Sequence, residues 1–148
     1  MLKRFALCVV AASLAVPVLA TSASAAPVQL DVVAVDYQLS GIPYRLTPRF
    51  YKFTFSNQGQ HEHEVVMFRK KDGVKRTWQG LLSMPEKKAM KKVKFIGFSW
   101  AKPGKDGKAI KSSYLRQGSY LAVCFFQNGD HAEPHFLKGM MRKFKVEK

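Results

Sequence analysis

Apolar and polar residues alternate along short segments of this 148-residue chain, and the alternation predicts β-strands. The clearest segment is FYKFTFS at 50–56, where Tyr51, Phe53 and Phe55 share one face and the residues between them are polar. A repeat of two residues is typical of a strand with one buried side. The segment VQLDVVAVDY at 28–37 is rich in valine and leucine and predicts another strand.

Further short strands are predicted along the rest of the chain, separated by turns rich in glycine, proline and asparagine. The predicted strands are 61–70, 94–100, the segment through Tyr120, Ala122 and Cys124, and 141–146. The predicted turns and loops are 57–60, 70–73, 101–109 and Gln117-Gly118, and 40–48 is a bend or a short edge segment. This pattern favours an all-β fold, a Greek-key β-sandwich or barrel.

One segment departs from strand spacing. In LLSMPEKKAMKKV at 81–93, apolar residues recur near helical spacing and lysines occupy the positions between them. We therefore expect one short, basic, amphipathic helix, with Pro85 in its first turn. The fold then carries a single helical insertion.

The first 25 residues have the layout of a secretory signal peptide. A basic start is followed by an apolar run and by Ala23-Ser24-Ala25, which places cleavage near Ala25/Ala26. The apolar run is short and rich in alanine, so we expect no stable membrane span after cleavage. Residues 26–148 then form one exported domain, periplasmic or extracellular, for which nucleic acid is not an expected partner.

The chain is strongly basic, with a formal net charge of +15. Removal of Lys3 and Arg4 with the leader leaves 23 basic and 10 acidic residues. Such a charge attracts an acidic redox protein or an anionic cell surface. The alternative is that lysines such as Lys87 and Lys88 form only a solvated face.

Cleavage also leaves one cysteine. Cys8 leaves with the leader, so Cys124 is the only thiol of the exported chain and cannot form an internal disulfide. A thiolate held by a metal ion has a chemical reason to persist in an oxidising compartment; the alternative is an inert, buried thiol.

Candidate metal ligands gather in two places, 61–63 and 124–141. Cys124, His135 and Met140 have the spacing C-x10-H-x4-M, with a strand leading into the cysteine and another beginning near the methionine. Two imidazoles, one thiolate and a weak axial thioether suit a one-electron copper site. His63 is the favoured fourth ligand because it begins a strand.

Some of these choices stay open at this stage. His61 competes with His63 as the first ligand, and Met141 competes with Met140 as the axial ligand. His131 lies in the segment NGDHAEP and is interpreted as an exposed loop residue.

Two segments resemble the cupredoxins, the family of blue (type 1) copper proteins that includes plastocyanin-like domains. FSNQGQHEHEVVMF resembles the segment around their first histidine ligand, and GSYLAVCFFQNGDHAEPHFLKGMMRKFKV resembles their closing strand, loop and strand. The resemblance implies one type 1 copper ion bound by His63, Cys124, His135 and Met140. It also implies a one-electron carrier, with the electron leaving through a histidine near the surface, here His135.

Two departures from the cupredoxin pattern concern the loops. The span from Cys124 to His135 is longer than in small blue copper proteins. Many cupredoxins also follow the first histidine with an asparagine that ties the two ligand loops together, and Glu64 stands there in this chain.

Other functions remain open from the sequence. The same residues would serve copper storage or delivery, and a zinc site would leave Met140 without a role. A metal-free cupredoxin-like module that binds anionic surfaces is a further alternative. An enzyme is not expected, since the chain has no second metal cluster, nucleophile motif or nucleotide loop.

Overall fold

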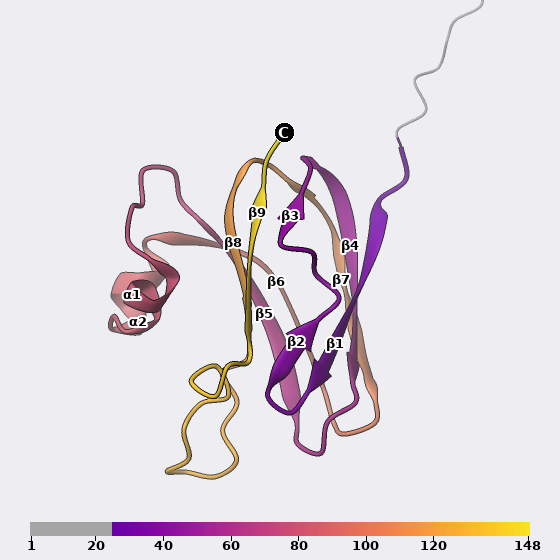
Figure 1. Ribbon diagram of the computed structural model, residues 1–148, viewed down its shortest axis with the longest axis vertical. Coiled ribbons are helices and arrows are strands. Elements are labelled where there is room, and N and C mark those ends of the chain that lie inside the picture. Colours follow the sequence, from indigo (N-terminus) through magenta and orange to yellow (C-terminus); the bar gives the residue numbers. More distant parts are fainter. Residues whose placement is uncertain (1–24) are drawn as a thin grey trace, which may run out of the picture.

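The computed structural model of the protein describes residues 25–148, in which two β-sheets pack against each other (Figure 1). The predicted signal peptide, apart from Ala25, falls outside these residues. One sheet has the strand order β2 (Gln38–Ser40), β1 (Val28–Val35), β4 (Arg49–Asn57), β7 (Asp106–Leu115). The other has the order β3 (Arg45–Leu46), β9 (Met141–Val146), β8 (Gly118–Val123), β5 (His63–Lys70), β6 (Val93–Ala101). The predicted all-β sandwich is confirmed.

Both sheets are mixed. β1 pairs with β4 in parallel and β3 pairs with β9 in parallel, while the remaining pairs are antiparallel. The short β3 lies at the edge of its sheet, in agreement with the edge segment expected within 40–48.

The core lies between the two sheets. The predicted apolar face of β4 is buried there, with Tyr51, Phe53 and Phe55 each at most 3% exposed. They share one apolar cluster with Met67 of β5 and Tyr120 of β8, from the opposite sheet. Burial of each such side chain contributes about 1.5–3 kcal/mol, so these strands stabilise the packing of the two sheets.

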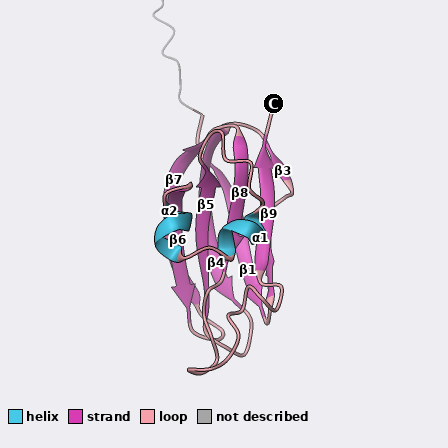
Figure 2. Cartoon of the chain, turned by 90° about the vertical axis from the view of Figure 1, so that its left-hand side faces the viewer, coloured by secondary structure: helices cyan, strands magenta, loops and turns pink. Residues whose placement is uncertain are grey.

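The helical insertion differs from the prediction. Two short helices, α1 (Trp78–Leu82) and α2 (Glu86–Met90), replace the single helix expected over 81–93. The prediction of one helix is wrong because Pro85 has no N–H and disfavours helical backbone at Met84. Pro85 is instead the N-cap of α2, and its carbonyl accepts from the backbone N–H of Lys88 and Ala89. Figure 2 shows both helices on the outer face of the five-stranded sheet.

β7 is a strand that the sequence did not indicate. The loop expected over 101–109 is confined to 102–105, and β7 begins at Asp106. Within β7 the buried positions are Ile110 and Leu115, five residues apart, and its pairing with β4 contains two register shifts. These irregularities break the alternation that would have predicted the strand.

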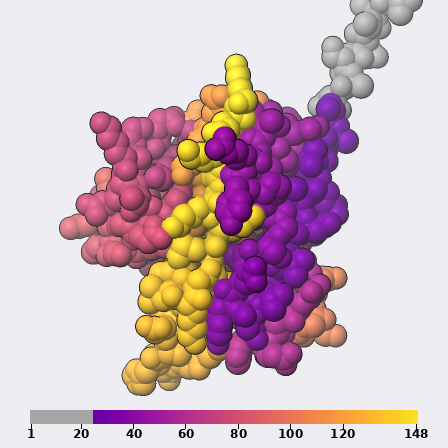
Figure 3. All heavy atoms as spheres, viewed as in Figure 1, coloured from indigo at the N-terminus to yellow at the C-terminus, as the bar shows by residue number. Residues whose placement is uncertain are grey.

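The connections at one end of the sandwich come from distant parts of the sequence. The turn between β1 and β2, the turn before β5 and the long loop between β8 and β9 lie together at the lower end in Figure 1. In Figure 3 the yellow and orange atoms of the long loop occupy that end beside the indigo β1–β2 segment. Neither helix in the described part of the chain is long and apolar enough to cross a membrane.

Candidate metal centre

Three of the four predicted ligands meet at this end of the sandwich. His63 begins β5, Cys124 directly follows β8, and His135 lies in the loop before β9. Their donor atoms all lie within 4.8 Å of one another, and the three residues are fully buried. Met140 is also fully buried and belongs to the same apolar cluster as Cys124.

Backbone hydrogen bonds hold the closing loop in place. The antiparallel pairing of β8 and β9 ends at Val123 and Met141, so Cys124 and Met140 are the next residues on each side. The Cys124 N–H donates to the Met140 carbonyl at 3.1 Å, and the Met140 N–H donates to the His135 carbonyl at 3.0 Å. The His135 N–H then donates to the Phe126 carbonyl at 2.8 Å. The long loop is therefore closed at its neck, and its extra length projects beyond the site.

Outer hydrogen bonds fix both imidazole rings. His63 Nε2 lies 2.5 Å from a carboxylate oxygen of Asp36, which can only accept, so this nitrogen carries the proton. His135 Nε2 lies 2.8 Å from Asn128 Oδ1, and the amide nitrogen of Asn128 donates to the Tyr37 hydroxyl. Nε2 of His135 is therefore also the protonated nitrogen.

This arrangement leaves two lone pairs facing each other. The Nδ1 atoms of His63 and His135 are 3.1 Å apart, and Cys124 Sγ lies 3.6 Å from Nδ1 of His135. Two acceptors at that distance repel unless a proton or a cation lies between them. A thiophilic metal ion is bound by imidazole nitrogens and thiolate sulfur, and the outer nitrogen of each imidazole is usually hydrogen-bonded to another residue. The residues present meet both conditions, so they fit a metal ion.

Glu64 ties the two ligand loops together. Its backbone N–H donates to Cys124 Sγ at 3.5 Å, and its carboxylate accepts from the Phe125 N–H at 3.0 Å. Burial raises the pKa of the Glu64 carboxyl, and the bond from Phe125 opposes that shift. Glu64 stands where many cupredoxins have an asparagine, and it links the two loops as that asparagine does in those proteins.

Burial also governs the protonation of Cys124 and His135. It raises the pKa of the Cys124 thiol to about 11, so the thiol is protonated at neutral pH without a cation nearby. Burial, followed by the neighbouring His63, Lys138 and His61, lowers the pKa of His135 to about 4. Both shifts favour a neutral set of donors before a metal ion enters.

The comparisons with known proteins concern the fold. No protein-family model matches the sequence, and no curated protein matches it. Among solved structures, the chain is similar to dithionite-reduced auracyanin from Roseiflexus castenholzii, with a TM-score of 0.55 and 13% identity over 84% of this chain and 100% of that one. The chain has the cupredoxin fold. Auracyanin B gives a TM-score of 0.53 and 19% identity over 85% of this chain and 94% of that one.

A third similar structure is auracyanin A, a "blue" copper protein from Chloroflexus aurantiacus. It gives a TM-score of 0.50 and 13% identity over 82% of this chain and 100% of that one. The cupredoxin resemblance of the two sequence segments is therefore confirmed for the fold.

The competing residues lie outside the group of donors. His61 is exposed, and its ring centre is 6.4 Å from that of His135. His131 is exposed in the projecting part of the loop, as expected from the sequence. Met141 packs in a second apolar cluster with Phe136, whereas Met140 packs in the main core.

One expectation about the site is wrong. His135 is fully buried rather than near the surface. The ring centres of Tyr37 and His135 are 5.0 Å apart, edge to face, and Lys138 Nζ lies over the Tyr37 ring. Asn128, from the projecting part of the loop, is hydrogen-bonded through Oδ1 to Nε2 of His135. In this cupredoxin fold the longer loop covers the histidine that the resemblance placed at the surface.

Sequence reasoning missed the residues that orient the donors. Asp36, Tyr37 and Asn128 lie in two connections remote from one another, and no spacing rule links them to the histidines. Gly59 carried a weak signal as part of a predicted turn. A Cβ atom there would lie 2.3 Å from Asp36 Oδ1 and 2.8 Å from His63 Nε2, so only glycine fits beside this pair.

Proposed function

We propose that the protein binds one copper ion through Nδ1 of His63, Nδ1 of His135 and Sγ of Cys124, with Met140 as a weak axial ligand. The observation that carries the proposal is the convergence of two imidazole Nδ1 atoms and one cysteine sulfur in a buried site. This donor set is the one that suits a type 1 copper ion, and the cupredoxin fold supports the same choice.

We further propose that the bound copper serves as a one-electron carrier. Copper supplies the change between Cu(II) and Cu(I), for which imidazole and thiolate are acceptable ligands in both states. The protein keeps the donors still: Asp36 and Asn128 hold the two rings, and Glu64 joins the strand of His63 to the loop of Cys124. A donor set that moves little between the two states suits fast electron exchange.

A carrier agrees with the burial of the site better than an enzyme does. His63, Cys124, His135 and Met140 are each 0% exposed, so no substrate reaches the donors directly. The predicted leader and the net positive charge support a role outside the cytoplasm with an acidic redox partner or at an anionic surface.

The test is to add Cu(II) to the purified protein and record visible and electron-spin spectra. A strong thiolate-to-copper band is expected, and Cys124→Ser removes it. Two matched pairs assign the other ligands: His63→Ala abolishes the band and His61→Ala preserves it, while Met140→Leu shifts the reduction potential and Met141→Leu does not. A wild-type protein without the band refutes the carrier, and a colourless, readily exchanged Cu(I) complex indicates storage or delivery instead.

A further inference from the structure

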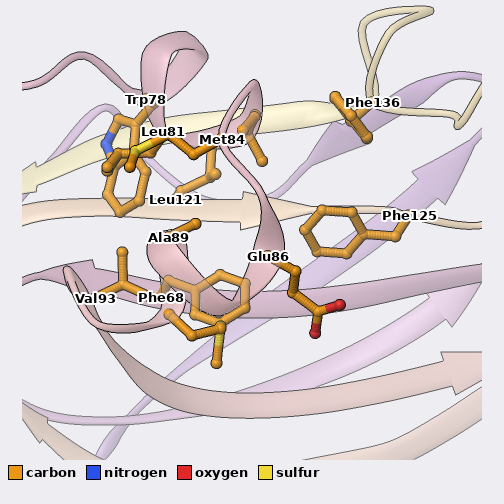
Figure 4. A pocket seen from close by; sticks show the side chains of 12 residues that line it. Phe68, Trp78, Leu81, Met84, Glu86, Ala89, Val93, Leu121, Phe125 and Phe136 are labelled. Carbon is orange, nitrogen blue, oxygen red and sulfur yellow. The ribbon is translucent and has the colours of Figure 1, made fainter.

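An apolar groove lies on the outer face of the five-stranded sheet, beneath the helical insertion. Its volume is about 470 Å³. Trp78 and Val93 lie at one end of the groove, while Phe125 and Phe136 lie at the other (Figure 4). The groove belongs to the second apolar cluster and is separate from the core between the sheets.

The aromatic end of the groove is formed by residues that follow two of the proposed copper ligands in the sequence. Phe125 directly follows Cys124, and Phe136 directly follows His135. The two rings contact each other with centres 5.5 Å apart, and Phe125 lies 6.4 Å from Phe68 in the floor of the groove. Phe125 is 38% exposed, although the donors beside it are fully buried. One peptide bond therefore separates the proposed copper ligand Cys124 from a solvent-exposed aromatic ring.

Exposed aromatic side chains extend this surface beyond the groove. Phe68 contacts Phe95 of β6 at a centre distance of 6.1 Å, and Phe95 is 57% exposed. Phe98 and Trp100 of the same strand are also exposed. A hollow beside exposed aromatic side chains fits a protein that inserts one side chain and covers the rest.

The rim of the groove is basic. Exposed Lys87 and Lys88 lie on α2, the helix that contributes Glu86 and Ala89 to the lining. Lys70 Nζ lies over the ring of the lining residue Trp78, 5.5 Å from its centre. Among residues 25–148 the ion pairs involve three arginines and His63, and no lysine takes part. Glu86 is the acidic residue among those that line the groove. These lysines are therefore available to carboxylates of a partner.

We infer that this groove is the docking surface for an acidic redox protein, which places an apolar side chain in the groove and exchanges one electron with the copper centre on the Phe125 side. The inference rests on the proposed function. When the carrier is reduced, one electron passes from Cu(I) to the oxidised partner, leaving Cu(II) and the reduced partner, and no proton moves. The covered position of His135 supports this side of the molecule over the loop end.

The first experiment maps binding with amide NMR spectra of the ¹⁵N-labelled protein, using an acidic cytochrome c as the probe and a basic cytochrome c as the control. Shifts are expected at Ala89, Phe125 and Phe136 with the acidic probe alone. The map is recorded with and without copper. Shifts confined to the loop end around Leu137, or no shifts, overturn the inference.

The second experiment measures the bimolecular rate of electron transfer to the same acidic cytochrome by stopped flow. Lys87→Glu/Lys88→Glu is expected to lower the rate about tenfold or more at low salt, because it reverses charge at the rim. The control Lys108→Glu/Lys111→Glu makes the same change of net charge on exposed positions of β7 in the opposite sheet, and is expected to change the rate less than about threefold. Ala89→Trp fills the groove and lowers the rate while the visible band stays.

The outcomes separate the two proposals. Absence of the copper band with an intact groove map refutes the proposed function and leaves the docking surface. A normal band with equal effects of both lysine pairs overturns the docking surface, since only general charge then matters. If the rim variant loses binding to vesicles of phosphatidylcholine with about 30% phosphatidylglycerol but keeps its rate with the cytochrome, the surface binds membrane and the inference is wrong.

Discussion

Replacement of Asp36 by asparagine tests whether a residue outside the donor set positions His63. Asp36 accepts three hydrogen bonds: from His63 Nε2, from the Gln60 N–H and from the His61 N–H. Partial burial acts to raise the pKa of the carboxyl, but the three bonds together outweigh it and lower the pKa below its ordinary value. The residue therefore stays ionised well into the acidic range. In Asp36→Asn one oxygen becomes an NH₂ group, which then faces an N–H donor.

The expected loss follows from the geometry of the bond to His63. A hydrogen bond to a charged group contributes about 1.5–3 kcal/mol, and the Asp36 side chain is 21% exposed, which favours the lower part of that range. A loss of about 1.5–2 kcal/mol corresponds to copper affinity weaker by roughly 10- to 30-fold. The ring of His63 also becomes free to adopt the other tautomer, so the visible band is expected to broaden.

Competition with a chelator of known copper affinity measures this change. Asp31→Asn is the matched control, because Asp31 is an exposed carboxylate of β1 that accepts from Thr54 and Gln29 and has no bond to the site. Its copper affinity is expected to equal that of the wild type. Equal affinities of Asp36→Asn and wild type, with the band unchanged, would refute the argument that Asp36 orients the ligand.

Four further predictions concern the site and the core. Since burial raises the pKa of the Cys124 thiol to about 11, copper binding releases the thiol proton, and chelator competition should show affinity rising about tenfold per pH unit between about pH 7 and 9. Burial lowers the pKa of His135 to about 4 in the folded copper-free protein, so the unfolded chain takes up the proton first as the pH falls. Denaturant titrations should therefore show a free energy of unfolding that is highest above about pH 6.5 and falls by up to about 3 kcal/mol towards pH 4. His135→Gln should flatten this dependence. Gly59→Ala should weaken copper binding in the same competition assay, because its Cβ overlaps Asp36 and His63. Phe53→Ala should cost about 3–5 kcal/mol in denaturant unfolding, because Phe53 is fully buried between the sheets; a loss under about 1 kcal/mol would contradict its place in the core.

The parts of the fold that the sequence predicted are those with regular patterns. β4 has strict alternation and β9 matches the predicted strand 141–146 at both ends. The pairing of β7 with β4 is irregular, and β7 has only two buried apolar positions, five residues apart. Its sequence therefore lacks the alternation of apolar and polar residues that predicts a strand. The helical insertion was recognised from its spacing, but the effect of Pro85 on the residue before it was not.

The site divides in the same way. Cys124, His135 and Met140 lie within seventeen residues, so their spacing carried the signal. His63 could be added because it begins a strand. Asp36 and Asn128 act through contacts that exist only after the sheets have packed, and a single sequence holds no local trace of such contacts.

The length of the loop between Cys124 and His135 determines how the site meets its surroundings. The ten residues between them do not loosen the site, because the His135 N–H binds the Phe126 carbonyl and closes the neck. The residues beyond the neck bring Asn128 against the His135 ring and the Tyr37 hydroxyl. A loop that contained only the neck would leave His135 open to solvent and to a partner at the end of the sandwich. Because the longer loop closes that end while Phe125 stays exposed beside Cys124, the same insertion that protects the histidine favours electron exchange from the side of the sheet.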